Sequence, residues 1–168
     1  MKVRLAGVIK ESIVDGPGIR LVVFAQGCVH NCSGCQNPDT HPLDGGYESN
    51  TDNILAEIKK NPLLSGVTLS GGEPFLQPKP FALLAGQIKK LKLSVIAYSG
   101  FTIEQLLALS KKDKDIKTLL ESIDTLVDGK FDPERLSPLL RFRGSDNQRI
   151  IDAPESVIQD KAVIREDF

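Results

Sequence analysis

Hydrophobic residues recur along this chain with two periods, one typical of strands and one typical of helices. Near the N-terminus, Val3 and Leu5 alternate with charged residues, and the turn-like Asp15-Gly16-Pro17-Gly18 precedes an apolar run at residues 21–25. Alternation is typical of a half-buried strand, and a short apolar run after turn residues is typical of a fully buried one. The pattern therefore predicts the first two strands at these positions.

Beyond residue 50 the chain alternates helix-like and strand-like segments. The first helix can be capped by Asn50 or Thr51, and Thr102 with Gln105 matches a capping box. Apolar stripes predict helices containing Ile54 to Ile58, Phe81 to Leu91, Ile103 to Leu107 and Ile116 to Ile123, and apolar runs predict strands at residues 67–69, 93–97, 125–127 and 150–151. Such alternation builds βαβ units, so we expect an α/β fold with a mainly parallel sheet. The roughly four or five units are too few for a closed eight-stranded barrel.

The segment from Gly27 to Gly46 shows neither period, yet it carries all three cysteines and both histidines. A long irregular segment inside a compact domain is usually functional. Three clustered cysteines cannot form a self-contained disulfide framework, which favours metal ligands or redox groups.

Length and charge exclude several classes of protein. The 168 residues suit one domain spanning residues 1–168, and 21 Lys+Arg against 22 Asp+Glu give a formal charge of −1. This balance argues against a nucleic-acid-binding surface or a membrane anchor. No apolar run reaches the roughly 18–20 residues of a membrane span, and no signal-peptide core follows Met1, so we expect a cytoplasmic protein.

The spacing Cys28-x3-Cys32-x2-Cys35 is the strongest chemical signal. Three thiolates without an obvious fourth ligand suit a four-iron cluster with one open iron. Two alternatives remain open on spacing alone. One is a structural zinc site completed by His30 or His41, and the other is a set of inert buried cysteines.

Other unusual residues follow the predicted strands, where the carboxyl ends of an open α/β sheet bind ligands. They are Ser70-Gly71-Gly72-Glu73-Pro74, Tyr98-Ser99-Gly100 and Asp128-Gly129-Lys130. The paired glycines let a ligand approach the backbone or simply form a turn. Glu73 is held extended by Pro74, or is a solvated loop acid. We expect one site at this edge, with Asp128 and Lys130 either in it or forming a salt bridge.

Taken together, these motifs resemble the radical S-adenosylmethionine (SAM) superfamily, with its CxxxCxxC loop and GGE motif. More narrowly, the chain is similar to the activating proteins of anaerobic ribonucleoside-triphosphate reductases over residues 13–151. The narrower resemblance lies in Asp15-Gly16-Pro17-Gly18-Ile19-Arg20, Gln26-Gly27-Cys28, Asn37-Pro38, Leu126-Val127-Asp128-Gly129-Lys130-Phe131 and Arg143-Gly144-Ser145-x-Asn147-Gln148. It implies a partial, open (βα) barrel.

The resemblance also implies roles for individual residues. Cys28, Cys32 and Cys35 would ligate a [4Fe-4S] cluster whose fourth iron chelates SAM. Gly34, Cys35 and Gln36 would line the adenine, whereas Gly71, Gly72 and Glu73 would meet the methionine end, and Asp128 and Lys130 would contact the ligand. Gln36 and His41 stand where an aromatic residue or histidine and a tryptophan are expected.

The implied activity is reductive cleavage of SAM and formation of a glycyl radical on the reductase, with an electron donor such as flavodoxin or ferredoxin. No separate acid–base residue is required. Arg141, Arg143 and Arg149 are candidates for docking the partner, or form a solvated loop. The alternatives are another small radical SAM enzyme, such as a different glycyl-radical activase or a deazapurine-type enzyme, and a non-catalytic zinc-binding interaction protein.

Overall fold

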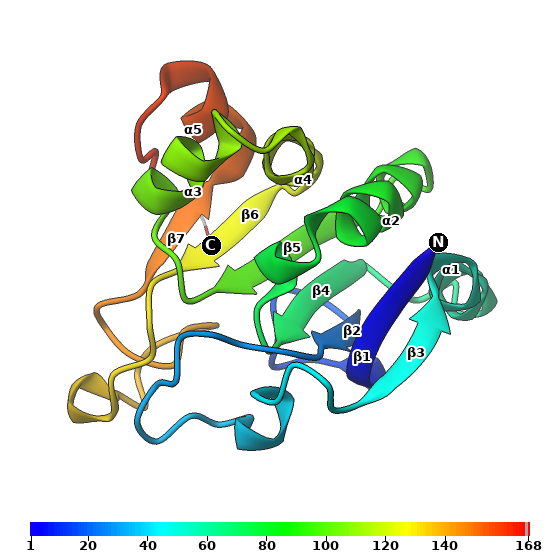
Figure 1. Cartoon of the computed structure of the whole chain (residues 1–168), viewed down its shortest axis with the longest axis horizontal. Helices are drawn as coiled ribbons and strands as arrows, with labels where there is room; N and C mark the ends of the chain where they lie inside the picture. The colour runs from blue at the N-terminus through cyan, green and yellow to red at the C-terminus, as the bar shows by residue number, and fades with distance from the viewer. Residues whose placement is uncertain (167) are drawn as a thin grey trace.

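The computed structural model describes residues 1–166 and 168, and it contains one seven-stranded sheet in the order β3-β1-β2-β4-β5-β6-β7 (Figure 1). The strands are β1 (Lys2–Ser12), β2 (Arg20–Ala25), β3 (Tyr47–Asn50), β4 (Gly66–Gly71), β5 (Ser94–Ser99), β6 (Thr125–Asp128) and β7 (Arg149–Asp152). The helices are α1 (Thr51–Lys60), α2 (Pro78–Lys90), α3 (Ile103–Ser110), α4 (Lys114–Ser122) and α5 (Ala153–Gln159). The fold is therefore α/β, as the alternating pattern predicts.

Four neighbouring strands, β2, β4, β5 and β6, run parallel, with Leu21 opposite Val67 and Val67 opposite Val95. The remaining strands join antiparallel: β1 to β2, β3 to β1 and β7 to β6. The two neighbours of β1 pair with different parts of it, β3 with residues 2–5 and β2 with residues 5–12. Within the part of the chain that the structure describes, the outer strands β3 and β7 do not pair, so the sheet stays open. The predicted mainly parallel, open arrangement is confirmed.

The helices form a layer against one face of the sheet (Figure 1). Their buried positions are those of the predicted stripes, among them Leu84, Ile88 and Leu119, each 0% exposed. One position differs: Leu91 is 38% exposed because α2 ends at Lys90 and Leu91 is its C-cap. Alternate strand residues such as Leu21 and Val23 pack into the same core. The opposite, concave face of the sheet is thereby left for other contacts.

Two elements carry no signal in the sequence. Strand β3 has the polar sequence Tyr-Glu-Ser-Asn, and it forms by pairing with β1 rather than by alternation. Helix α5 has seven residues, of which Ala153 and Ser156 are buried. The caps were predictable: Asn50 accepts a hydrogen bond from the Asp52 amide, and Thr102 and Gln105 form a capping box.

The amino ends of the central strands are joined by Arg20, which is 1% exposed. Its guanidinium donates to Thr68 Oγ1 at 2.8 Å, to Val67 O at 2.8 Å and to Ser94 Oγ at 2.9 Å. These acceptors are all neutral, and burial lowers the pKa of Arg20 to about 10. One side chain thus connects β2, β4 and β5.

No helix among residues 1–166 and 168 has the length and apolar character needed to cross a membrane.

Candidate functional site

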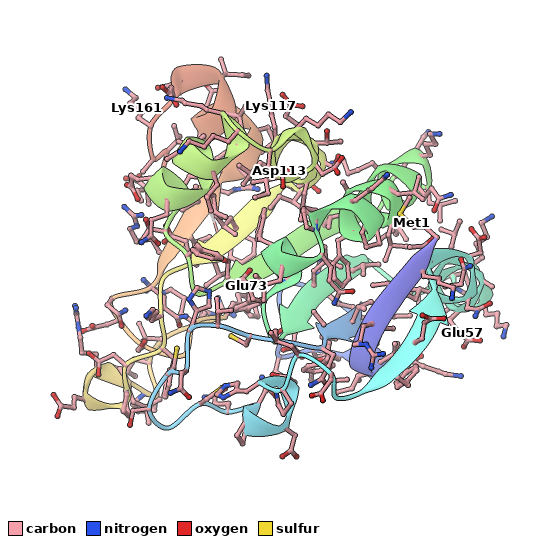
Figure 2. The ribbon with its side chains drawn as sticks, in the orientation of Figure 1. Met1, Glu57, Glu73, Asp113, Lys117 and Lys161 are labelled. Atoms are coloured by element: carbon pink, nitrogen blue, oxygen red, sulfur yellow. The ribbon has the colours of Figure 1, made fainter. Side chains whose placement is uncertain are left out.

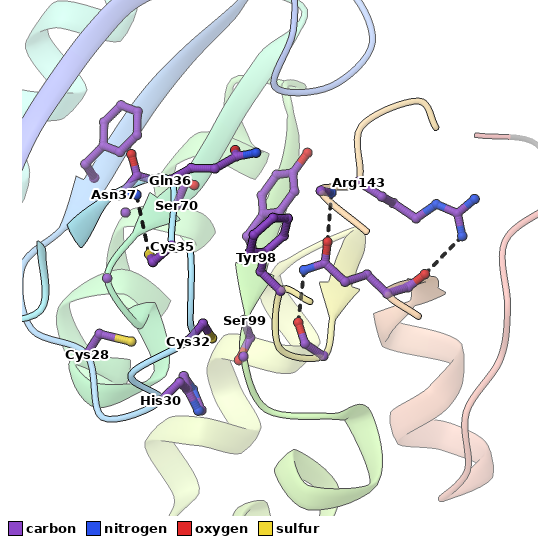
Figure 3. Close-up of a pocket in the computed structure, with 18 of the residues that line it drawn as sticks. Cys28, His30, Cys32, Cys35, Gln36, Asn37, Ser70, Tyr98, Ser99 and Arg143 are labelled. Atoms are coloured by element: carbon purple, nitrogen blue, oxygen red, sulfur yellow. Dashed lines mark hydrogen bonds between the residues drawn. The ribbon is translucent and has the colours of Figure 1, made fainter. Parts of the chain in front are cut away.

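A cavity of about 470 Å³ opens at the carboxyl ends of the parallel strands (Figure 3). The long loops gather at this edge (Figure 1). Its walls come from the loop after β2, the ends of β4 and β5, and the segment between β6 and β7. Residues predicted for the site that line it are Cys28, Cys32, Cys35, Gln36, Gly71 and Gly72. The expected single site at this edge is therefore a real hollow, and it contains the strongest sequence motif.

Backbone hydrogen bonds fold the cysteine loop, residues 27–37, over this edge. Gly27 N donates to Thr40 O at 2.8 Å, and Cys28 N donates to His41 O at 3.1 Å. Farther along, Cys35 N donates to Cys32 O at 3.3 Å, and Asn37 N approaches Cys35 Sγ at 3.4 Å. The loop is thus held at its two ends, with the cysteines between.

The three thiols are free and partly exposed, and Figure 3 shows them bordering one side of the cavity. Among the described residues, no three His, Cys, Asp or Glu side chains are gathered around one metal-sized point. A single zinc needs its ligands to converge on one atom, whereas each thiolate of a cluster binds a different iron and the set surrounds a volume. Burial raises the pKa of the Cys28 thiol, so a metal must displace its proton. The arrangement fits a four-iron cluster.

The zinc alternative also lacks its expected fourth ligand at His30. The side chain of His30 is 6% exposed, and its Nε2 lies 2.6 Å from Glu73 Oε2. Its ring also packs edge-on against Phe101, with the ring centroids 4.4 Å apart. His30 is therefore already engaged, whereas His41, the other histidine of the zinc alternative, lines the cavity.

The glycines after β4 bring backbone close to other backbone. Gly71 has φ of +90°, and a Cβ there would lie 2.7 Å from Ala25 N. A Cβ at Gly72 would overlap the carbonyl of Gly27 and reach 3.0 Å from Thr40 O. Both glycines also line the cavity, so this turn touches the cysteine loop on one side and the ligand space on the other.

Glu73 is buried, at 0% exposed, and is not the solvated loop acid that the sequence left open (Figure 2). Its carboxylate accepts from Phe75 N at 3.0 Å, Gly100 N at 3.0 Å and Ser99 Oγ at 2.9 and 3.0 Å, besides its contact with His30. The side chain is not among those that line the cavity. Glu73 therefore joins three loops beneath the cavity.

Asp128 is 1% exposed, and its salt-bridge partner is Arg149 rather than Lys130. Its Oδ1 and Oδ2 accept from Arg149 at 3.0 and 2.6 Å, and Oδ2 also accepts from Ile103 N at 2.7 Å. Arg149 additionally binds Glu104, whose pKa it lowers to about 2. This corrects the interpretation of Arg149 as a docking residue, because its guanidinium is committed within the chain.

Of the other predicted residues, Arg143 lines the cavity, whereas Lys130, Gly34 and Arg141 do not. Lys130 is exposed, and its carbonyl accepts from Asn147 Nδ2 at 2.8 Å. Gly34 has φ of +66° and packs near Pro133. Arg143 lines the cavity and donates to Gln148 O at 3.0 Å, whereas Arg141 lies over the Phe142 ring. The segment 143–148 therefore braces the loop after β6.

Two aromatic side chains of the cavity wall come from strands. Tyr98 was among the residues expected at this edge, whereas Phe24 was missed. Tyr98, at the end of β5, donates to Phe142 O at 2.7 Å, and burial raises its pKa. Phe24, in β2, lines the same cavity. Both occupy the concave face because they alternate with core residues, a signal that was present in the strand pattern.

Comparison with known proteins places the chain in a family. The model of the 4Fe-4S single cluster domain matches residues 14–151. An anaerobic ribonucleoside-triphosphate reductase-activating protein from Vibrio cholerae is 35% identical over 82% of this chain and 90% of its own length. Proteins of the same name from Escherichia coli K12 (31% identical, covering 81% of this chain and 90% of theirs) and phage T4 (31%, 82% and 86%) also match.

Among solved structures, QueE from Escherichia coli aligns with a TM-score of 0.47 and 17% identity, over 61% of this chain and 54% of that one. The sequence relatives, in contrast, span nearly their whole length. The chain belongs to the 4Fe-4S single cluster domain family and, within it, to the anaerobic ribonucleoside-triphosphate reductase-activating proteins.

Proposed function

We propose that this chain is a radical SAM activase that generates a glycyl radical on an anaerobic ribonucleoside-triphosphate reductase. The single observation that carries the proposal is the shared cavity, which has three free thiols on one wall and the Gly71-Gly72 turn on another. The names of the relatives supply the target. Cys28, Cys32 and Cys35 would hold the [4Fe-4S] cluster.

A [4Fe-4S] cluster held by these cysteines, with SAM, would supply one-electron reductive cleavage of the sulfonium and hydrogen abstraction from a glycine. The chain's own residues bind and orient. The backbone of Gly71 and Gly72 leaves room for the methionine end, and Gly34, Cys35 and Gln36 lie on the stretch proposed for the adenine. Close confinement of reactants is the main contribution such a site makes to rate.

Asp128 and Lys130 are proposed to serve the same ligand in different ways: Lys130 contacts it, and Asp128 supports the site. Lys130 is exposed and free to meet a carboxylate. The carboxylate of Asp128 already accepts three hydrogen bonds, so its contribution is to hold the end of β6 against α3 and β7. This assigns binding to Lys130 and support to Asp128.

The mouth of the cavity suits a protein segment better than a free metabolite. Exposed apolar side chains lie on two loops of its wall: Val14, which lines the cavity, is 73% exposed, and Leu139, next to the lining residue Leu140, is 88% exposed. An entering loop of the reductase would cover such side chains and exclude water from the radical. The proposed substrate is therefore a backbone glycine of the partner.

The test uses reduced, SAM-loaded protein and the anaerobic reductase labelled with α-deuterated glycine. Deuterium in 5′-deoxyadenosine together with a glycyl radical signal by electron paramagnetic resonance is the expected result. Turnover of a free metabolite without deuterium transfer would favour a small-molecule enzyme. Anaerobically purified protein that is colourless and contains stoichiometric zinc would favour the alternative of a non-catalytic zinc-binding interaction protein.

A further inference from the structure

His30 lies in the cysteine loop between two proposed ligands, and it lines the cavity while its ring reaches into the protein. In Figure 3 its ring is drawn below Cys32 and Ser99. The ring is 6% exposed and approaches a carboxylate that is fully buried. Buried polar side chains are nearly always hydrogen-bonded, and this pairing indicates that the His30 side chain has a structural role.

The partner, Glu73, collects donors from three separate segments. Phe75 N belongs to the turn after β4, Gly100 N and Ser99 Oγ belong to the loop after β5, and His30 belongs to the loop after β2. Glu73 already accepts from two amides and a hydroxyl, so the His30 tautomer that carries hydrogen on Nε2 completes the set. At 2.6 Å this is the shortest contact that Glu73 makes, as expected of a charge-assisted hydrogen bond.

The packing around the ring fixes its orientation. Phe101 meets it edge-on at an interplanar angle of 78°. A Cβ at Gly100 would overlap the imidazole, so the glycine provides the space in which the ring lies. Ring position and hydrogen bond therefore agree, and neither depends on a bound cofactor.

We infer that His30 is a positioning residue, which fastens the cysteine loop to Glu73 and thereby sets where the three thiols stand relative to the Gly71-Gly72 turn. The hydrogen bonds to the thiols come from amides of the same loop: Asn37 N approaches Cys35 Sγ at 3.4 Å, and the backbone of His30 and Asn31 bonds to the Cys28 thiol. The loop ends are held by backbone bonds at Gly27 and Cys28. His30, which lies between Cys28 and Cys32 in the sequence, supplies the side-chain link from the loop to Glu73. The loop is therefore prearranged before iron binds.

This inference rests on the proposed function only for what the thiols bind, so its test begins with cluster-free protein. The variants are His30→Ala, His30→Phe and His30→Gln. Phenylalanine keeps a ring against Phe101 without a donor, whereas glutamine can place an amide N–H near the position of Nε2. Val29→Ala, in the same loop at a 56% exposed residue, is the matched control.

Hydrogen exchange of the apoproteins is the first measurement. Loss of one charge-assisted bond should raise exchange of the amides of residues 28–35 by about tenfold or more in the alanine and phenylalanine variants. Glutamine should restore most of the protection, and the control should match wild type. Equal protection in wild type, alanine and phenylalanine variants would overturn the inference.

Anaerobic reconstitution is the second measurement, with iron and sulfide content and the reduction midpoint of the bound cluster as readouts. The alanine and phenylalanine variants should load less iron and show a shifted midpoint, and the glutamine variant should lie near wild type. Wild-type protein that binds no iron would contradict the proposed function, while the exchange data would still decide the role of His30. Normal loading and an unchanged midpoint in all three variants would refute the inference.

Discussion

Two buried carboxylates lie at the same edge of the sheet, Glu73 after β4 and Asp128 at the end of β6, and they have different kinds of hydrogen-bond donors. Glu73 accepts from backbone amides, a serine hydroxyl and an imidazole, whereas Asp128 accepts from a guanidinium that is itself shared with Glu104. The first network joins loops, and the second joins β6, β7 and α3. The difference indicates that the Glu73 side of the edge shapes a site, while the Asp128 side mainly stabilises the fold.

The largest effect is expected at the cysteines, and it falls on iron content and SAM cleavage rather than on stability. Replacing Cys28, Cys32 or Cys35 by alanine should remove nearly all iron and all SAM cleavage. The partly exposed thiols contribute little to packing, so the free energy of unfolding of the apoprotein should change by less than about 1 kcal/mol. Metal analysis and urea denaturation check this, and a variant that unfolds would instead favour a structural metal.

On the other side, Asp128→Ala should act on stability. Removing the carboxylate leaves Arg149 paired with Glu104 alone and Ile103 N without an acceptor, a change that costs about 1–3 kcal/mol. Urea denaturation measures the loss, and the folded fraction should still bind iron. A loss below about 1 kcal/mol, combined with weaker SAM binding, would make Asp128 a ligand contact instead.

The Gly72→Ala variant tests the contact between the Gly71-Gly72 turn and the cysteine loop. A Cβ would overlap the Gly27 carbonyl, next to Cys28, so we expect a loss of about 1–3 kcal/mol together with reduced iron loading and weaker SAM binding. The matched control is Gly86→Ala in α2, where nothing lies within 4 Å of the added carbon and helix propensity should add about 0.5–1 kcal/mol. Weaker SAM binding with full iron loading would restrict Gly72 to the ligand contact.

The smallest effect concerns Glu104, whose pKa is lowered from 4.5 to about 2 by Arg149. A depressed folded-state pKa stabilises the protein above pH 4.5, and that contribution is lost as pH falls from 4.5 toward 2. The Glu104 side chain is 54% exposed, so solvent screening limits the difference between wild type and Glu104→Gln to about 1 kcal/mol.

Thermal unfolding at pH 7 and pH 3 measures this difference. Glu134→Gln, at an exposed residue whose side chain has no partner among those the structure describes, should show no comparable pH dependence. A difference between wild type and Glu104→Gln that persists unchanged at pH 3 would contradict the assignment.

Periodicity predicts the parallel strands and the helices of the core because burial on one face produces them directly. It fails at β3, whose polar residues become a strand only because β1 offers an edge, and at α5, which is too short to show a stripe. These elements depend on tertiary pairing, which a local pattern does not contain.

The site divides in a similar way. The cysteine spacing and the glycine pair are local motifs and were readable, and the structure brings them to one cavity. The contacts of His30 with Glu73, 43 residues away, and of Asp128 with Arg149, 21 residues away, depend on topology. A sequence shows that such groups exist but not which of them meet.

Arg20 has a consequence for motion. By bonding to Thr68, Val67 and Ser94 it opposes sliding of β2, β4 and β5 past one another at their amino ends. At the carboxyl ends the corresponding link is made by Glu73, which contacts the loops after β2, β4 and β5. The backbone of the cysteine loop has positive φ at Gly27, Asn31 and Gly34. The three strands are therefore tied at both ends, and movement around an incoming cofactor or protein segment falls to the parts of the loops that Glu73 does not hold.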